Sequence, residues 1–113
     1  MIASLVSAAK GLARKMYGDL SQPRITYGEL GQIFTALDDS EVLQTYRAAM
    51  RELAPNTWDV VKRTRMPFEH AEANLGRLTE LGLVDRHDHE QIPGDTSIYY
   101  LTPKGLLVAR RYM

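Results

Sequence analysis

Basic side chains are concentrated near the middle of the chain, where Lys62, Arg63 and Arg65 lie within one helical turn of each other. Ammonium and guanidinium groups placed together in this way can neutralise the phosphates of a nucleic acid backbone. They can equally form an ordinary solvated face of a helix. If the stretch ends a short helix that crosses DNA, we expect these side chains to contact phosphates without reading sequence.

A second group of residues with binding chemistry follows on one further helix. His70, Ala73 and Asn74 lie in its first turns, the part of a recognition helix that usually reaches base edges. An asparagine can form paired hydrogen bonds with adenine, an alanine can contact the thymine methyl group, and a histidine can donate to guanine or to phosphate. Arg77 lies one turn further along and is expected to contact the DNA backbone.

The stretch from 59 to 84 supplies the two helices that would position these groups. Pro67 begins the second helix, where its missing N–H costs nothing. Apolar residues then recur at three- and four-residue steps, which predicts one buried face; they are Phe68, Ala71, Leu75, Leu78 and Leu81. Gly82 is placed for a left-handed C-cap, so the second helix is predicted over 67–81.

A β-hairpin is predicted after the second helix, over 83–101. Pro93-Gly94-Asp95 is a turn signal, and Ser97-Ile98-Tyr99-Tyr100-Leu101 has the β-branched and aromatic content of a returning strand. Arg86 lies near the base of the hairpin and is included among the expected DNA contacts. A short helix, a turn, a longer helix and a hairpin form the skeleton of a winged helix-turn-helix.

Two motifs in this region resemble winged-helix transcription regulators of the MarR and PadR type. The first is Glu80-Leu81-Gly82-Leu83-Val84-Asp85-Arg86, and the second, about twenty residues further on, is Tyr100-Leu101-Thr102-Pro103-Lys104-Gly105. In those families such a helix end leads into the wing, and such a leu-thr-x-x-gly step leads from the wing into the next helix. The resemblance covers residues 57–112. It implies a DNA-binding regulator that forms its dimer through added terminal helices.

The first half of the chain predicts a helical layer over residues 1–55. Apolar spacing over 2–17 predicts a long amphipathic helix. This helix either packs on its own domain or serves as a dimerisation helix, and a membrane-surface helix is a third possibility. Thr26 and Glu29 have the spacing of a capping box that starts a second helix.

A third helix is predicted from the acidic residues after Leu37 up to Leu53, before Pro55 interrupts it. Asn56 and Asp59 are spaced to cap the short basic helix that follows. Trp58 is expected to anchor that helix in the core.

Net charge gives DNA binding no support of its own. Fourteen Lys and Arg residues balance fourteen Asp and Glu residues. The helix expected to read bases also carries Glu69, Glu72 and Glu80. A protein that binds DNA without sequence preference is usually basic. The charge balance is therefore compatible with a sequence-specific dimer or with a module that binds other proteins.

Residue types disfavour several other classes of function. The chain has no cysteine, which excludes disulfides and thiolate zinc sites. His87-Asp88-His89-Glu90 offers two imidazoles and two carboxylates, but no distant ligand accompanies them, so a polar hairpin is the preferred interpretation. Because catalytic and phosphate-loop motifs are missing, we expect no enzyme and no cofactor. Charged residues interrupt the apolar N-terminal stretch, so no membrane or secretory segment is expected, and the predicted location is cytoplasmic.

These observations predict a single, mainly α-helical domain over 1–113 with a small β-hairpin wing. An N-terminal helical layer precedes a winged helix-turn-helix over 56–113. We expect a sequence-specific DNA-binding regulator of transcription, acting as a homodimer through its N- and C-terminal helices, with 67–81 in the major groove of double-stranded DNA. The alternative is a winged-helix module that binds other proteins within a larger assembly.

Overall fold

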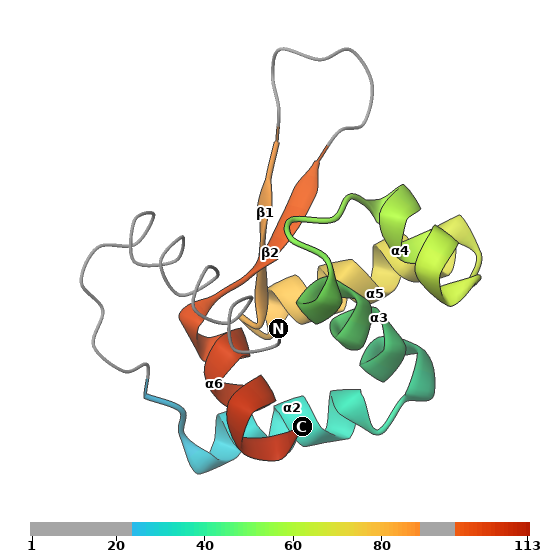
Figure 1. Ribbon diagram of the computed structural model, residues 1–113. Coiled ribbons are helices and arrows are strands. Elements are labelled where there is room, and N and C mark those ends of the chain that lie inside the picture. The colour runs from blue at the N-terminus through green and yellow to red at the C-terminus, as the bar shows by residue number, and fades with distance from the viewer. Residues whose placement is uncertain (1–23, 89–96) are drawn as a thin grey trace.

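The computed structural model describes residues 24–88 and 97–113. Within these ranges the chain is mainly helical, with five α-helices and one antiparallel pair of short strands (Figure 1). The elements are α2 (Tyr27–Leu37), α3 (Ser40–Arg51), α4 (Thr57–Thr64), α5 (Phe68–Glu80), β1 (Val84–His87), β2 (Ile98–Leu101) and α6 (Pro103–Tyr112). The helix predicted over 2–17 and the predicted turn at Pro93-Gly94-Asp95 lie outside the described residues.

Side-chain caps fix where four of the helices begin. Thr26, Asp39, Asn56 and Thr102 each accept a hydrogen bond from a backbone N–H in the first turn of the helix that follows. The predicted cap of α4 forms and is reciprocal: Asn56 Oδ1 accepts from the N–H of Asp59 at 2.8 Å, and Asp59 Oδ2 accepts from the N–H of Asn56 at 3.0 Å. These bonds satisfy donors that a helix start would otherwise leave unpaired.

The capping box predicted at the start of α2 forms only in part. The N–H of Glu29 donates to Thr26 Oγ1 at 3.1 Å, as expected. The Glu29 carboxylate, however, pairs with Lys104 Nζ of α6 at 2.9 Å instead of returning to Thr26. A charged donor binds a carboxylate more strongly than a neutral backbone N–H does, so the tertiary partner replaces the local one.

One apolar core joins all the described helices. Each helix contributes at least one side chain that is no more than 1% exposed, including Ile33, Tyr46, Val60, Leu75 and Val108. Burying a side chain of this size contributes roughly 1.5–3 kcal/mol. The Tyr46 hydroxyl donates to the carbonyl of Gly105 within this core, and burial raises the pKa of Tyr46 far above its ordinary value.

A three-residue turn joins α4 to α5. Arg65 adopts the left-handed conformation with φ 62°, and its N–H donates to the carbonyl of Val61 at 2.7 Å. Met66, the middle residue of this turn, is buried. Pro67 occupies the cap position rather than the first helical position, so α5 begins one residue later than predicted, at Phe68.

The two strands follow α5 directly. Gly82 has φ 75°, and the N–H of Leu83 donates to the carbonyl of Leu78 at 3.0 Å, which confirms the predicted left-handed cap. β1 then pairs with β2 in antiparallel register, with Val84 opposite Leu101. The N–H of Tyr99 donates to the carbonyl of Pro55 at 2.8 Å, so the sheet also holds the segment that enters α4.

A close backbone contact joins α6 to the entry of β1. A Cβ atom on Gly105 would lie 2.0 Å from the carbonyl oxygen of Leu83, so only glycine fits at this position. The N–H of Thr102 donates to that same carbonyl at 3.1 Å, and the Thr102 hydroxyl donates to the carbonyl of Gly82. These contacts fix the direction in which the chain leaves α5.

Two sequence predictions about the core are wrong. Trp58 was expected to anchor α4, but its side chain is 55% exposed, and Val60 fills the core instead. The third helix was predicted to extend to Leu53, but α3 ends at Arg51 and Leu53 is 60% exposed. Both errors have one cause: an apolar residue near a helix end does not share the burial of the helix middle.

Candidate nucleic-acid interface

The end of α4 carries the predicted phosphate contacts on its surface. Lys62, Arg63 and Arg65 are all exposed. The side chains of Lys62 and Arg65 form no ion pair or hydrogen bond within the part of the chain that the structure describes. Arg63 differs, because its Nε donates to Glu52 Oε1 at 3.2 Å. The structure therefore leaves two of the three cations free to meet an external anion.

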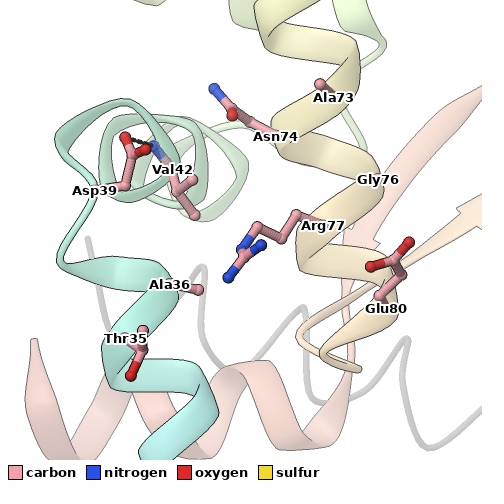
Figure 2. A pocket seen from close by; sticks show the side chains of 9 residues that line it. All are labelled: Thr35, Ala36, Asp39, Val42, Ala73, Asn74, Gly76, Arg77 and Glu80. Carbon is pink, nitrogen blue, oxygen red and sulfur yellow. Dashed lines mark hydrogen bonds between the residues drawn. The ribbon is translucent and has the colours of Figure 1, made fainter.

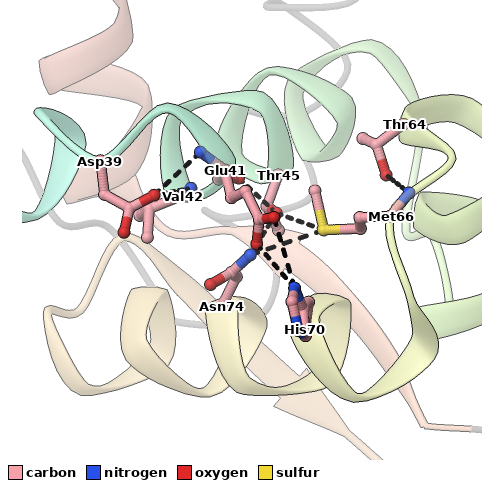
Figure 3. A network of polar contacts seen from close by, with 8 residues as sticks. All are labelled: Asp39, Glu41, Val42, Thr45, Thr64, Met66, His70 and Asn74. Carbon is pink, nitrogen blue, oxygen red and sulfur yellow. Dashed lines mark hydrogen bonds and ion pairs between the residues drawn. The ribbon is translucent and has the colours of Figure 1, made fainter.

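Asn74 is held against α3 by hydrogen bonds (Figure 3). Its Nδ2 lies 3.3 Å from Thr45 Oγ1 and 3.5 Å from Met66 Sδ, and its side chain is half-buried. Thr45 in turn donates to the carbonyl of Glu41 at 2.8 Å. An asparagine amide has two N–H donors, and both have acceptors here. A paired contact with adenine would therefore require at least one of these bonds to break.

His70 also has a partner on α3. Its Nδ1 lies 3.1 and 3.3 Å from the two carboxylate oxygens of Glu41 (Figure 3). The His70 and Glu41 side chains are 55% and 44% exposed. Ion pairs with this much solvent contact contribute little to stability. His70 can therefore exchange this partner for another at low cost.

Ala73 and Arg77 are exposed on α5 and have no such partners within the described residues. Ala73 is exposed, and its short side chain leaves the middle of the α5 surface open to solvent. Arg77 extends from α5 toward α2, across the space between the two helices (Figure 2). Its side chain has no ion pair or hydrogen bond within residues 24–88 and 97–113.

Arg77 enters an open groove between α5 and the junction of α2 and α3. The groove has a volume of about 520 Å³. It is lined by Thr35, Ala36, Asp39, Val42, Ala73, Asn74, Gly76, Arg77 and Glu80. A second hollow of about 590 Å³ continues it along α2 and shares Thr35, Arg77 and Glu80. The groove keeps the guanidinium accessible from solvent.

Arg86 is engaged at the end of the strand pair that lies away from α5. Its Nε donates to Asp88 Oδ1 at 2.8 Å and to Ser97 Oγ at 3.0 Å. The Ser97 hydroxyl also donates to Asp88. The Ser97 hydroxyl and the Arg86 guanidinium hold the pKa of Asp88 below its ordinary value. Like Arg63, Arg86 already faces an acidic partner, which lowers its attraction for a phosphate.

The electrostatic character of the surface changes from α4 to α5. The end of α4 presents Lys62 and Arg65, whereas the exposed side chains of α5 include Glu69, Glu72 and Glu80. Within the described residues none of these three glutamates forms an ion pair. A polyanion is therefore attracted to the end of α4 and repelled by much of α5.

The residues that hold His70 and Asn74 are not apparent from the sequence. Glu41, Thr45 and Met66 lie on other elements, and the contacts with Glu41 and Thr45 span 29 residues of sequence. Helical periodicity identifies the face on which a residue lies but not the neighbour that meets it. No local signal could have found these partners.

Neither a metal centre nor a membrane span is supported by the described residues. No three His, Asp or Glu side chains among them are grouped to hold a metal ion. His89 and Glu90, the last two residues of the His87-Asp88-His89-Glu90 segment, lie outside the described ranges. Likewise, none of the helices described for 24–88 and 97–113 is long and apolar enough to cross a membrane.

Comparison with known proteins adds no family to this description. The sequence matches no protein family model, and no curated protein is significantly similar to it. The interpretation of the site therefore depends on the geometry of the site itself.

Proposed function

We propose that the protein is a sequence-specific regulator that binds double-stranded DNA through a winged helix-turn-helix. In this proposal α5 lies in the major groove, and the end of α4 lies on the phosphate backbone. One observation carries the proposal: α5 presents an open outer surface beside a helix end where Lys62 and Arg65 lack any described partner. A helix that enters a groove next to free cations is the arrangement that such binding needs.

The phosphate contacts come from both sides of α5. Lys62 and Arg65 can bind phosphates without first leaving a partner among the described residues. Arg63 exchanges Glu52 for a phosphate, and Arg86 exchanges Asp88. The Arg63–Glu52 pair is partly exposed, as is the Arg86–Asp88 pair, and exposed ion pairs contribute little to stability. The exchange therefore costs little compared with several phosphate contacts.

The base contacts are assigned to the outer surface of α5. Ala73 can approach a thymine methyl group, and Arg77 can reach a phosphate or a guanine. His70 can donate to DNA after leaving Glu41. Asn74 has two alternatives: it leaves Thr45 and Met66 to bind adenine, or it stays and holds α5 against α3. Its half-buried position favours the supporting role.

A homodimer would compensate for the absence of net positive charge. Two subunits that bind half-sites about 34–36 Å apart double the number of phosphate contacts. At the C-terminal end, Tyr112 and Met113 are 46% and 44% exposed, and Tyr112 packs edge-on against Phe34 with ring centroids 5.0 Å apart. This apolar surface supports our proposal that the terminal helices form the dimer contact, together with the helix predicted over 2–17.

Fluorescence anisotropy of a labelled random duplex, titrated with protein at three salt concentrations, tests the proposal. We expect binding at low salt, with a dissociation constant in the micromolar range or tighter, that weakens steeply as salt increases. A selection for preferred sites would then follow. If the duplex does not bind even at low salt, the proposal is wrong.

The glutamates of α5, which form no ion pair within the described residues, favour one second candidate, a module that binds other proteins. Glu69→Gln together with Glu72→Gln separates the two. If α5 enters the major groove, removing two negative charges strengthens duplex binding. If α5 instead binds a basic surface of another protein, neither the original protein nor the double variant binds the duplex.

A further inference from the structure

Two aromatic side chains form an exposed edge where α4 and α5 begin. Trp58 is the second residue of α4 and is 55% exposed, whereas Phe68 is the first residue of α5 and is half-buried. Their ring centroids are 4.5 Å apart, with an interplanar angle of 40°. We call this pair the aromatic edge. An exposed tryptophan that packs on one neighbour keeps a large flat surface open to a ligand.

The aromatic edge is held in place from both sides. The reciprocal cap between Asn56 and Asp59 fixes the first turn of α4. Pro67, with φ −58° at the cap of α5, restricts the backbone next to Phe68. The rings are therefore presented on rigid helix starts, which reduces the entropy lost when a ligand binds.

Two cations follow the aromatic edge in the chain. Trp58 and Lys62 are four residues apart in α4, so they share one side of that helix, and Arg65 follows in the turn after α4. Lys62 lies about 6 Å further along the helix axis than Trp58, from the rise of an α-helix. Neither cation has an ion pair or hydrogen bond in the described part of the chain.

We infer that the aromatic edge binds an unpaired nucleobase of single-stranded nucleic acid, which stacks on Trp58 while Lys62 and Arg65 hold the neighbouring phosphates. An aromatic surface beside a row of cations is the combination used to bind single strands, because every base has a flat face and every nucleotide has a phosphate. Stacking is tolerant of sequence. The site therefore takes single strands of any composition.

The charges favour this ligand over a protein partner. Protein interfaces bury roughly 800 Å² on each side, and their centres are depleted in lysine. Here Lys62 and Arg65 follow the aromatic edge directly, without acidic partners among the described residues. Arg63, one residue from Lys62, is already paired with Glu52. The two unpaired cations fit a ligand with repeated negative charges.

The inference extends the proposed function but does not depend on it. Both use Lys62 and Arg65, yet duplex binding assigns no role to Trp58 or Phe68. A single-strand site beside a duplex site would allow the protein to hold a locally opened base pair. Each activity can be measured without the other.

The chain contains one tryptophan, so its intrinsic fluorescence reports directly on the aromatic edge. We would titrate the full chain with a single-stranded oligothymidine and with an abasic oligonucleotide of equal length. Stacking on Trp58 predicts saturable quenching by oligothymidine and little quenching by the abasic strand. Equal affinity and equal quenching for the two strands would overturn the inference, because phosphates alone would then explain binding.

Variants of the aromatic edge are tested by anisotropy of labelled oligothymidine. Trp58→Ala is expected to weaken binding at least about fivefold, the lower range for loss of one stacked base. Trp58→Phe retains a flat ring and should recover most of the affinity. Leu53→Ala is the matched control, since Leu53 is 60% exposed but has no aromatic face, and it should bind like the original protein. Thermal unfolding verifies that each variant is folded.

Duplex titrations with Trp58→Ala distinguish failure of this inference from failure of the proposed function. We expect the duplex affinity of this variant to stay within about twofold of the original. If Trp58→Ala and Leu53→Ala bind oligothymidine equally well, no base stacks on Trp58 and the inference is wrong. If oligothymidine gives neither quenching nor anisotropy at low salt, the inference is also wrong, and a protein partner becomes the preferred ligand of the aromatic edge.

Discussion

The end of α4 and the α3-facing side of α5 carry similar polar residues but use them differently. At the end of α4, Lys62 and Arg65 face solvent and have no partner among the described residues. On α5, His70 pairs with Glu41 and Asn74 bonds to Thr45. Residues of the first kind are available to a ligand. Residues of the second kind already contribute to the fold and can bind a ligand only by exchange.

This difference assigns affinity and specificity for DNA to different parts of the molecule. Contacts with phosphates give affinity that does not depend on sequence, and the free cations of α4 are suited to this role. Contacts with base edges give specificity, and on α5 they must come from exposed positions such as Ala73 and Arg77 or from residues that first leave α3. We therefore expect substitutions in α4 to alter binding and substitutions in the α3–α5 contact to alter stability.

Disrupting the contact of α6 with the entry of β1, which lies outside both regions, should have the largest effect. Gly105→Ala places a Cβ 2.0 Å from the carbonyl oxygen of Leu83, a backbone atom that cannot move aside without displacing β1. We expect the free energy of unfolding to fall by about 3 kcal/mol or more, measured by urea denaturation. Gly31→Ala is the control, because a Cβ there meets nothing within 4 Å; it should stabilise α2 by about 0.5–1 kcal/mol. Equal stability of the two variants would contradict the close packing of α6 on β1.

Asn74→Ala tests whether the α3–α5 contact is structural. The substitution removes the bonds to Thr45 and Met66, and we expect it to destabilise the fold by about 1 kcal/mol. Glu72→Ala, on an exposed position of the same helix, should alter stability by less than about 0.5 kcal/mol. Site discrimination in duplex binding decides the second role of Asn74. A loss of about 1–3 kcal/mol in discrimination would assign a base contact to it, and no loss would leave it a supporting residue.

The end of the strand pair that lies away from α5 should give the smallest effect, which is a change in one pKa. The Ser97 hydroxyl and Arg86 lower the pKa of Asp88. Because the folded pKa lies below the ordinary value, this contribution to stability is present above about pH 4 and is lost as the pH falls through the folded pKa. Titration of the Asp88 carboxyl by NMR should show the lowered pKa, and Ser97→Ala should return it toward the ordinary value. An unchanged pKa in Ser97→Ala would show that the hydroxyl is not the main cause.

The sequence predicted local features well because their partners lie a few residues away. Asn56 and Asp59 are three residues apart, and the left-handed position of Gly82 follows directly from the end of α5. The order of helices and strands was accessible for the same reason. The buried face of α5 was also predicted from spacing, since Ala71, Leu75 and Leu78 are fully buried.

Features that depend on distant partners were not predictable. Glu29 has the spacing of a capping box, yet its carboxylate binds Lys104. Asn74 has the position of a base-reading residue, yet its amide bonds to Thr45, 29 residues away. Trp58 has the composition of a core residue, yet it lies at a helix start and remains 55% exposed. For Glu29 and Asn74 the deciding neighbour is brought close only by packing of the helices, and for Trp58 the position at the helix end decides its exposure.

Salt dependence of duplex binding by a charge-matched pair of variants tests the central claim most directly. The first variant, Lys62→Ala with Arg65→Ala, removes the free cations of α4. The second, Arg110→Ala with Arg111→Ala, removes the same charge from the end of α6, which lies on the other side of the molecule (Figure 1). Sedimentation establishes that both variants keep the oligomeric state of the original protein.

Loss of phosphate contacts should reduce the slope of log affinity against log salt by about 0.9 for each contact. We predict that the α4 variant shows this reduced slope and weaker binding, while the α6 variant retains the slope of the original protein. Equal slopes for the two variants would contradict the assignment of the DNA backbone to the end of α4.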